Sequence, residues 1–194
     1  MAGVQRVCVY CGSSGRVAEA FRESARRTGR LLAEAGMELV YGGGHVGLMG
    51  LTADAALAAG GHVVGIIPDF LHDRELAHTK LSELIVVPSM HERKQRMFER
   101  ADAFAILPGG LGTLDETFEC MTWKQLGLHD KPIVVVDVDG YWKPLMALID
   151  HAIGAGFAPV KLRKMVDVVP SAEALIALLK SAPEPHVPPH PERA

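Results

Sequence analysis

The sequence predicts a single α/β domain of Rossmann type, with a doubly wound, mainly parallel sheet of about seven strands. Apolar, β-branched segments alternate with helical patterns along almost all of the 194 residues. These segments lack polar alternation, as is typical of parallel strands that helices cover on both faces. Glycine-rich turns follow several of them, at the points where a parallel sheet binds its ligands.

The order of the elements follows from the hydrophobic pattern. Predicted strands cover residues 6–11, 37–44, 62–68, 83–88, 103–110, 131–140 and 165–170. Predicted helices cover residues 17–35, 47–59, 89–101, 113–126, 141–153 and 171–181. Between the third and fourth strands, residues 69–82 are rich in charges and histidines. They predict a loop or a short irregular helix, the kind of insertion that often carries substrate contacts.

One domain is expected to span residues 1–181, since this length buries a single core. Residues 182–194 form a proline-rich tail that is expected to be disordered.

The composition excludes several classes of protein. A net charge of −3 argues against a nucleic-acid-binding surface, which would be basic. The sequence has neither a signal-peptide pattern nor an apolar run of the ~18 residues that a membrane span needs. Three cysteines fit a reducing, cytoplasmic compartment. Cys8 and Cys11 form a C-x-x-C, but the first lies inside a predicted strand, so core residues are favoured over a redox pair.

Known cofactor and metal motifs are missing or weak. The sequence has no P-loop motif and no G-x-S-x-G elbow, and its G-x-G-x-x-G pattern follows the second strand instead of the first. The nine histidines show no spacing typical of metal ligands. We therefore expect neither a metal nor a cofactor.

Four turns at predicted strand ends carry the candidate chemistry: residues 11–15, 41–50, 88–94 and 108–113. Three of them contain glycines, which let backbone N–H groups approach an anion at a helix N-terminus. Each alone is also compatible with simple tight turning. Together they favour a nucleotide or a sugar phosphate as ligand.

The third predicted helix, residues 89–101, is expected to begin with a capping box formed by Ser89 and Glu92. Met90, Arg93, Lys94 and Met97 share one face of this helix. Cations in a first turn oppose the helix dipole, and a bound phosphate or carboxylate would relieve that conflict. The alternative is a solvated surface with extended aliphatic stems.

A second capping box, T-x-x-E, pairs Thr113 with Glu116. Capping alone does not explain why Gly109, Gly110 and Gly112 precede and flank Thr113. In a first turn the helix dipole would favour the ionised carboxylate. Glu116 would then act as a base or as an anion facing positive charge, and not as a general acid.

These motifs resemble the LONELY GUY family of cytokinin riboside 5′-monophosphate phosphoribohydrolases, proteins often labelled lysine decarboxylases. "PGGLGTLDE" matches the family pattern P-G-G-x-G-T-x-x-E, "YGGGHVGLMG" matches Y-G-G-G-x-x-G-L-M-G, and "SMHERK" is similar to M-H-x-R-K. The resemblance covers roughly residues 5–180. It implies hydrolysis of the N-glycosidic bond of a nucleoside 5′-monophosphate, giving adenine or an N6-substituted adenine and ribose 5-phosphate.

The resemblance also implies residue roles, with Arg93 and Glu116 as the catalytic pair. The implied substrate contacts are Met90, Lys94, Gly109, Gly110, Leu111, Gly112, Thr113 and Thr122, with Ser13, Gly43 and Gly44 from other glycine turns and Glu75 from the irregular segment. It further implies a homodimer with the active site near the subunit boundary. The alternative is a non-catalytic nucleotide-binding or carrier module on the same fold.

Glycosidic cleavage passes through an oxocarbenium-like state. An ionised Glu116 would stabilise that charge and orient the attacking water. Arg93, with a pKa above ~12, is expected to anchor and polarise the substrate, although acid catalysis at the base stays open. Decarboxylation would instead need a lysine Schiff base to pyridoxal phosphate, and no lysine stands out for that role.

Overall fold

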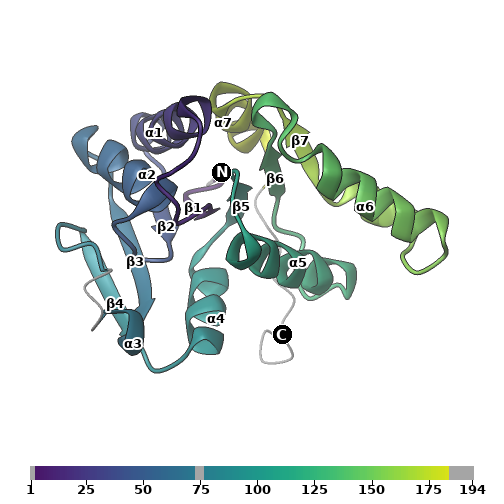
Figure 1. Cartoon of the computed structure of the whole chain (residues 1–194), viewed down its shortest axis with the longest axis horizontal. Coiled ribbons are helices and arrows are strands. Elements are labelled where there is room, and N and C mark those ends of the chain that lie inside the picture. Colours follow the sequence, from purple (N-terminus) through teal and green to yellow (C-terminus); the bar gives the residue numbers. More distant parts are fainter. Residues whose placement is uncertain (1–2, 73–76, 184–194) are drawn as a thin grey trace.

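The computed structural model describes residues 3–72 and 77–183, and its centre is one seven-stranded parallel sheet (Figure 1). The strands are β1 (Arg6–Tyr10), β2 (Glu38–Tyr41), β3 (Val63–Pro68), β4 (Glu83–Val87), β5 (Ala103–Ile106), β6 (Ile133–Val136) and β7 (Asp167–Val169). Their order is β4-β3-β2-β1-β5-β6-β7, and every pairing is parallel. The predicted fold class and all seven predicted strands are confirmed.

Helices cover both faces of the sheet. They are α1 (Glu19–Glu34), α2 (Gly47–Ala58), α3 (Asp69–Leu71), α4 (Met90–Arg100), α5 (Leu111–Gln125), α6 (Lys143–Gly154) and α7 (Ala172–Ser181), with 3-10 turns η2 (Val138–Gly140) and η3 (Val160–Lys164). One core packs α1, α2 and α7 against the sheet, and the other packs α4, α5 and α6. All six predicted helices are present, and α3 is the short helix expected after the third strand.

Side chains of β1 alternate between the two cores. Val7 and Val9 belong to the α1–α2–α7 core, and Cys8 belongs to the α4–α5–α6 core. Cys11, beyond the strand end, lies in the first of these cores. Both thiols are free and buried, and burial raises the pKa of each well above its ordinary value. The interpretation of the C-x-x-C as core residues is confirmed.

The strand order reverses between β1 and β5, because the chain winds to one side of β1 and then returns to pair on its other side. Such a switch point leaves a crevice at the carboxyl ends of the strands, where ligands of doubly wound sheets bind. The glycine turns after β1 and β5 meet there, since Gly12 N–H donates to the Pro108 carbonyl at 3.0 Å.

Two other expectations concern the C-terminal tail and membrane-spanning helices. Of the predicted tail 182–194, residues 184–194 lie outside the described residues, so its disorder stays a prediction. Within residues 3–72 and 77–183, no helix is long and apolar enough to cross a membrane.

Gly29 lets α1 and α2 approach each other closely. It is buried in α1, and a Cβ atom at this position would lie 2.0 Å from the carbonyl oxygen of Thr52 in α2. Backbone atoms cannot yield as a flexible side-chain end can, so the two helices would have to separate. The position of α2, and with it the glycine turn before α2, therefore depends on a glycine at residue 29.

We expect Gly29→Ala to lower the free energy of unfolding by about 1–3 kcal/mol, because overpacking outweighs the ~1 kcal/mol gain in helix propensity. Urea denaturation measures the change. Gly154→Ala is the matched control, because a Cβ there would meet nothing within 4 Å in the described structure. That variant should be as stable as the wild type or slightly more stable. Equal stability of Gly29→Ala and wild type would contradict the close-packing account.

Candidate active site

A cavity of about 190 Å³ lies at the switch point between β1 and β5. It is lined by Cys11, Gly12, Ser13, Met49, Arg93, Gly110, Leu111, Gly112, Thr113 and Glu116. The turn after β1, the start of α5 and the side chain of Arg93 from α4 thus converge on one space. The structure brings together the two predicted catalytic residues and most of the predicted phosphate-binding turn.

The guanidinium of Arg93 is buried and held by main-chain carbonyls. The residue is 8% exposed, so the alternative of a solvated surface is excluded. Its Nε donates to the carbonyl of Ile66 in β3 at 3.1 Å, and its Nη2 donates to the carbonyl of Gly42 after β2 at 3.0 Å. Ser89 caps α4 as predicted, by accepting from the Glu92 N–H at 3.1 Å. Two strand ends and a capped helix therefore fix where this positive charge lies.

Gly42 is a residue whose role the sequence did not reveal. A Cβ at this position would lie 1.8 Å from Nη2 of Arg93, so any side chain would displace the guanidinium. The run of three glycines from residue 42 to residue 44 was the available signal, but nothing in it shows which glycine makes room for an arginine 51 residues later.

Glu116 faces Arg93 across the cavity. Its Oε1 lies 4.0 Å from Nη1 of Arg93, and both side chains are 10% exposed. Burial raises the pKa of Glu116 to about 7, and Arg93 only partly offsets this effect. A carboxyl group with this pKa can take up and release a proton near neutral pH, as a general acid or base must.

The expected effect of the helix dipole on Glu116 was wrong. α5 begins at Leu111, two residues earlier than predicted, so Glu116 lies in the second turn and the first turn holds no acid. Dipole stabilisation falls off within the first turn, so desolvation dominates instead. The side chain is consequently less ionised at neutral pH than the sequence suggested.

The predicted capping role of Thr113 was also wrong. The residue that precedes α5 is Gly110, and no side chain caps the helix. The Thr113 side chain instead packs against Gly109. A Cβ atom at residue 109 would lie 2.1 Å from the Thr113 hydroxyl oxygen, which explains why residue 109 is glycine. The first intrahelical bond runs from the Leu114 N–H to the Gly110 carbonyl at 3.0 Å. The N–H groups of the first turn, before Leu114, therefore have no intrahelical acceptor.

Gly110 and Gly112 are open on their exposed side. A Cβ at either position would meet no described atom within 4 Å, and neither has a positive φ. The fold itself therefore does not demand glycine at these two positions. Room for a ligand against the backbone is the physical reason that remains.

Lys94 lies beside Arg93 on α4 and pairs with two acids of α5. Its Nζ is 3.1 Å from a carboxylate oxygen of Asp115 and 3.1 Å from one of Glu119. Burial opposes the charge of Lys94, but the two carboxylates outweigh it and raise the pKa. Met90 is 37% exposed, with its sulfur 3.8 Å from Nη1 of Arg93. Both residues border the Arg93–Glu116 pair without lining the cavity.

The other predicted contacts fall into three groups. Ser13 lines the cavity, and Gly43, with φ of +74°, and Gly44 shape the neighbouring turn without lining it. Thr122 lies elsewhere, in a groove of about 120 Å³ between α5 and α6, and its hydroxyl donates to the Phe118 carbonyl at 2.7 Å. Glu75 lies outside the described residues.

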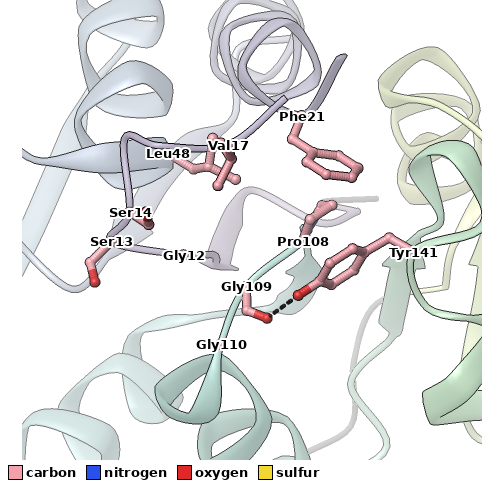
Figure 2. Close-up of a pocket in the computed structure, with 10 residues that line it drawn as sticks. All are labelled: Gly12, Ser13, Ser14, Val17, Phe21, Leu48, Pro108, Gly109, Gly110 and Tyr141. Carbon is pink, nitrogen blue, oxygen red and sulfur yellow. Dashed lines mark hydrogen bonds between the residues drawn. The ribbon is translucent and has the colours of Figure 1, made fainter. Parts of the chain in front are cut away.

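A second cavity, of about 290 Å³, adjoins the first on the α1 side (Figure 2). The two share Gly12, Ser13 and Gly110, and the second is otherwise mainly apolar. The phenol of Tyr141 forms one wall, and its hydroxyl donates to the Gly109 carbonyl at 2.7 Å. Tyr141 is thus a second residue near the site that no sequence motif singled out.

Among residues 3–72 and 77–183, no group of three or more His, Cys, Asp or Glu side chains is arranged so that it could hold a metal ion.

Comparison with known proteins identifies the family. Residues 49–179 match the family model described as "Possible lysine decarboxylase". A relative from Oryza sativa subsp. japonica, named "Probable cytokinin riboside 5'-monophosphate phosphoribohydrolase", is 45% identical over 94% of this chain and 74% of its own length. A cytokinin riboside 5′-monophosphate phosphoribohydrolase from Arabidopsis thaliana is 43% identical over 96% of this chain and 85% of its own length. The chain belongs to this phosphoribohydrolase family.

Solved structures of the same fold are more distant from this phosphoribohydrolase family member. The molybdenum cofactor binding protein of Rippkaea orientalis aligns with a TM-score of 0.70 and 22% identity, over 91% of this chain and 96% of its own. The molybdenum cofactor carrier protein of Chlamydomonas reinhardtii gives a TM-score of 0.70 and 21% identity over the same shares. At this identity they show the shared fold alone. The word decarboxylase in the family description gains no support from the cavity, whose lining contains no lysine.

The raised pKa of Glu116 makes stability depend on pH. The folded chain binds this proton more tightly than the unfolded chain, whose glutamate has a pKa near 4.5. The stability that Glu116 contributes is therefore complete below about pH 4.5 and is lost as the pH rises through about 7. Glu116→Gln has no proton to lose at this position. As the pH rises from 4.5 to 8, its free energy of unfolding should therefore increase by on the order of 3 kcal/mol relative to that of the wild type.

Urea unfolding at pH 5 and pH 8 measures this difference. Glu34→Gln, at an exposed position near the end of α1, is the control and should follow the wild type at both pH values. If the free energies of unfolding of wild type and Glu116→Gln changed equally from pH 5 to pH 8, burial would not perturb the pKa of this carboxyl group.

Proposed function

We propose that this chain hydrolyses the N-glycosidic bond of adenosine 5′-monophosphates, including N6-substituted ones, and releases the free base and ribose 5-phosphate. The observation that carries the proposal is the buried Arg93–Glu116 pair, which shares one cavity with an uncapped helix N-terminus. The names of its relatives, cytokinin riboside 5′-monophosphate phosphoribohydrolases, support the same activity.

The start of α5 is suited to the 5′-phosphate. The N–H groups of Leu111, Gly112 and Thr113 have no intrahelical acceptors, and an anion there also gains from the helix dipole. Open space at Gly112 lets the phosphate approach the backbone. Binding energy from this remote group can position the ribose for reaction.

Glu116 and Arg93 then serve the ribose. As the C1′–N9 bond breaks, its electron pair leaves with the base and positive charge develops on the ring. The carboxylate of Glu116 stabilises this charge and accepts a proton from the water that attacks C1′, a role that suits its pKa of about 7. Arg93 keeps its proton. Two carbonyls orient its guanidinium, so its fixed positive charge can anchor and polarise the substrate. The departing base takes its proton from solvent.

We expect Glu116→Gln to lower kcat/KM for AMP and N6-isopentenyl-AMP by about 10²–10⁴-fold, because the variant has neither a base nor an anion at this position. Arg93→Lys should also lose activity, since one ammonium cannot donate to both carbonyls and still face the ribose. Chromatography of the released base measures both effects, with Glu34→Gln as control. Absence of free base with the wild type would favour the non-catalytic nucleotide-binding module instead.

A homodimer with the active site near the subunit boundary is part of the proposal. Thr122 lies in a groove whose apolar walls include Phe118, 38% exposed, and Leu148, 56% exposed. Apolar side chains this exposed gain from contact with another subunit. A second copy packed on this groove would bury Thr122 in the interface. The free cysteines further support a reducing, cytoplasmic setting.

Leu148→Asp tests this interface, because a charge on α6 should dissociate a dimer that buries it. We expect sedimentation equilibrium to show a dimer for the wild type and a monomer for the variant. The control is Lys180→Asp, a change at an exposed position of α7, which packs against the other face of the sheet. A monomeric wild type, or a variant that stays dimeric, would contradict the proposed interface.

A further inference from the structure

Tyr141 reaches from the turn after β6 to the glycine turn after β5. Its hydroxyl donates to the carbonyl oxygen of Gly109 at 2.7 Å (Figure 2). Two aromatic neighbours fix the ring edge-on, with centroid separations of 5.3 Å to Phe21 and 4.8 Å to Trp142. The approach of the chain is also constrained, since Asp139 adopts a φ of +52° in the preceding turn. This hydroxyl is therefore presented to Gly109 by a well-defined local structure.

The contact orients a whole peptide unit. The peptide bond between Gly109 and Gly110 is trans and planar, so its C=O and N–H point in opposite directions. Gly109 and Tyr141 line the second cavity and not the catalytic one, whereas Leu111–Thr113 line only the catalytic cavity. A carbonyl held towards Tyr141 consequently directs the Gly110 N–H towards the catalytic side.

The Gly110 N–H is available to a ligand. Among the described residues it donates to no backbone or side-chain acceptor, and it adjoins the free N–H groups at the start of α5. It would add a further donor to the cluster that faces the phosphate.

Glycine on both sides makes this peptide unit easy to rotate. Rotation changes only ψ of Gly109 and φ of Gly110, and glycine meets little steric resistance to either change. A rotated peptide would turn the Gly109 carbonyl, with its partial negative charge, towards the phosphate. A hydrogen bond that holds this carbonyl on the opposite side prevents the repulsion.

We propose that Tyr141 is a positioning residue that directs the Gly110 N–H at the 5′-phosphate of the substrate. The inference rests on the proposed function, because it assumes a phosphate at the start of α5. Removal of the hydroxyl weakens phosphate binding and leaves the Arg93–Glu116 pair unchanged. The effect appears in substrate binding and not in the chemical step.

Tyr141→Phe is the test, since it keeps the ring that packs on Phe21 and Trp142. We expect KM for AMP and Kd for ribose 5-phosphate, measured by calorimetry, to rise about 3- to 10-fold, as befits one hydrogen bond. The kcat for AMP should stay within about 2-fold and the melting temperature should not change, because the aromatic packing is retained. Tyr41→Phe is the matched control, since the Tyr41 hydroxyl is buried without a partner in the described structure.

The outcomes separate the two proposals. An unchanged Kd for ribose 5-phosphate, or a loss of kcat at constant KM, would overturn the role of Tyr141. If the wild type binds ribose 5-phosphate but releases no base from AMP, the proposed reaction fails, and the Kd of Tyr141→Phe still decides about Tyr141. A wild type that does not bind ribose 5-phosphate would overturn the phosphate site and with it the role of Tyr141, whereas release of base from AMP would still decide about the reaction.

Discussion

The candidate site depends on one buried charge, the guanidinium of Arg93. Carbonyls at the ends of β2 and β3 hold it, and the missing side chain of Gly42 makes room for it. A buried cation needs such partners, because its desolvation is costly. Both carbonyls belong to the strand ends, so the sheet itself positions the charge. The same charge limits how far burial can raise the pKa of Glu116, and it thereby links the sheet to the proposed chemistry.

Around this charge the site contains two sets of polar groups that the protein leaves unsatisfied. The first turn of α5 has unpaired donors because Gly110, and not a capping side chain, precedes it. The carboxyl group of Glu116 is buried without a close ion pair, since its Oε1 is 4.0 Å from Nη1 of Arg93. Each feature would be a cost in a purely structural helix. A phosphorylated ribose offers an anion to the donors and a developing cation to the carboxylate, so one ligand satisfies both.

Sequence patterns predicted the fold well because a parallel sheet covered on both faces leaves a clear record of apolar segments and glycine turns. They also placed Arg93 and Glu116 in the site. The capping box at Thr113 failed because α5 begins two residues earlier than the T-x-x-E pattern predicts, directly after Gly110. Gly42 and Tyr141 went unnoticed because each matters only through a partner distant in sequence.

By itself the sequence determined which residue types meet at the carboxyl edge of the sheet. The strands and the glycine turns that follow them can each be recognised from a short stretch of sequence. Only the tertiary structure decided the state of those residues. It buried Glu116 beyond the first turn, and so the pKa rose to about 7 where the local pattern suggested a stabilised anion. It also separated Thr122 from the cavity. Desolvation and distance are properties of packing between elements, and no short stretch of sequence contains them.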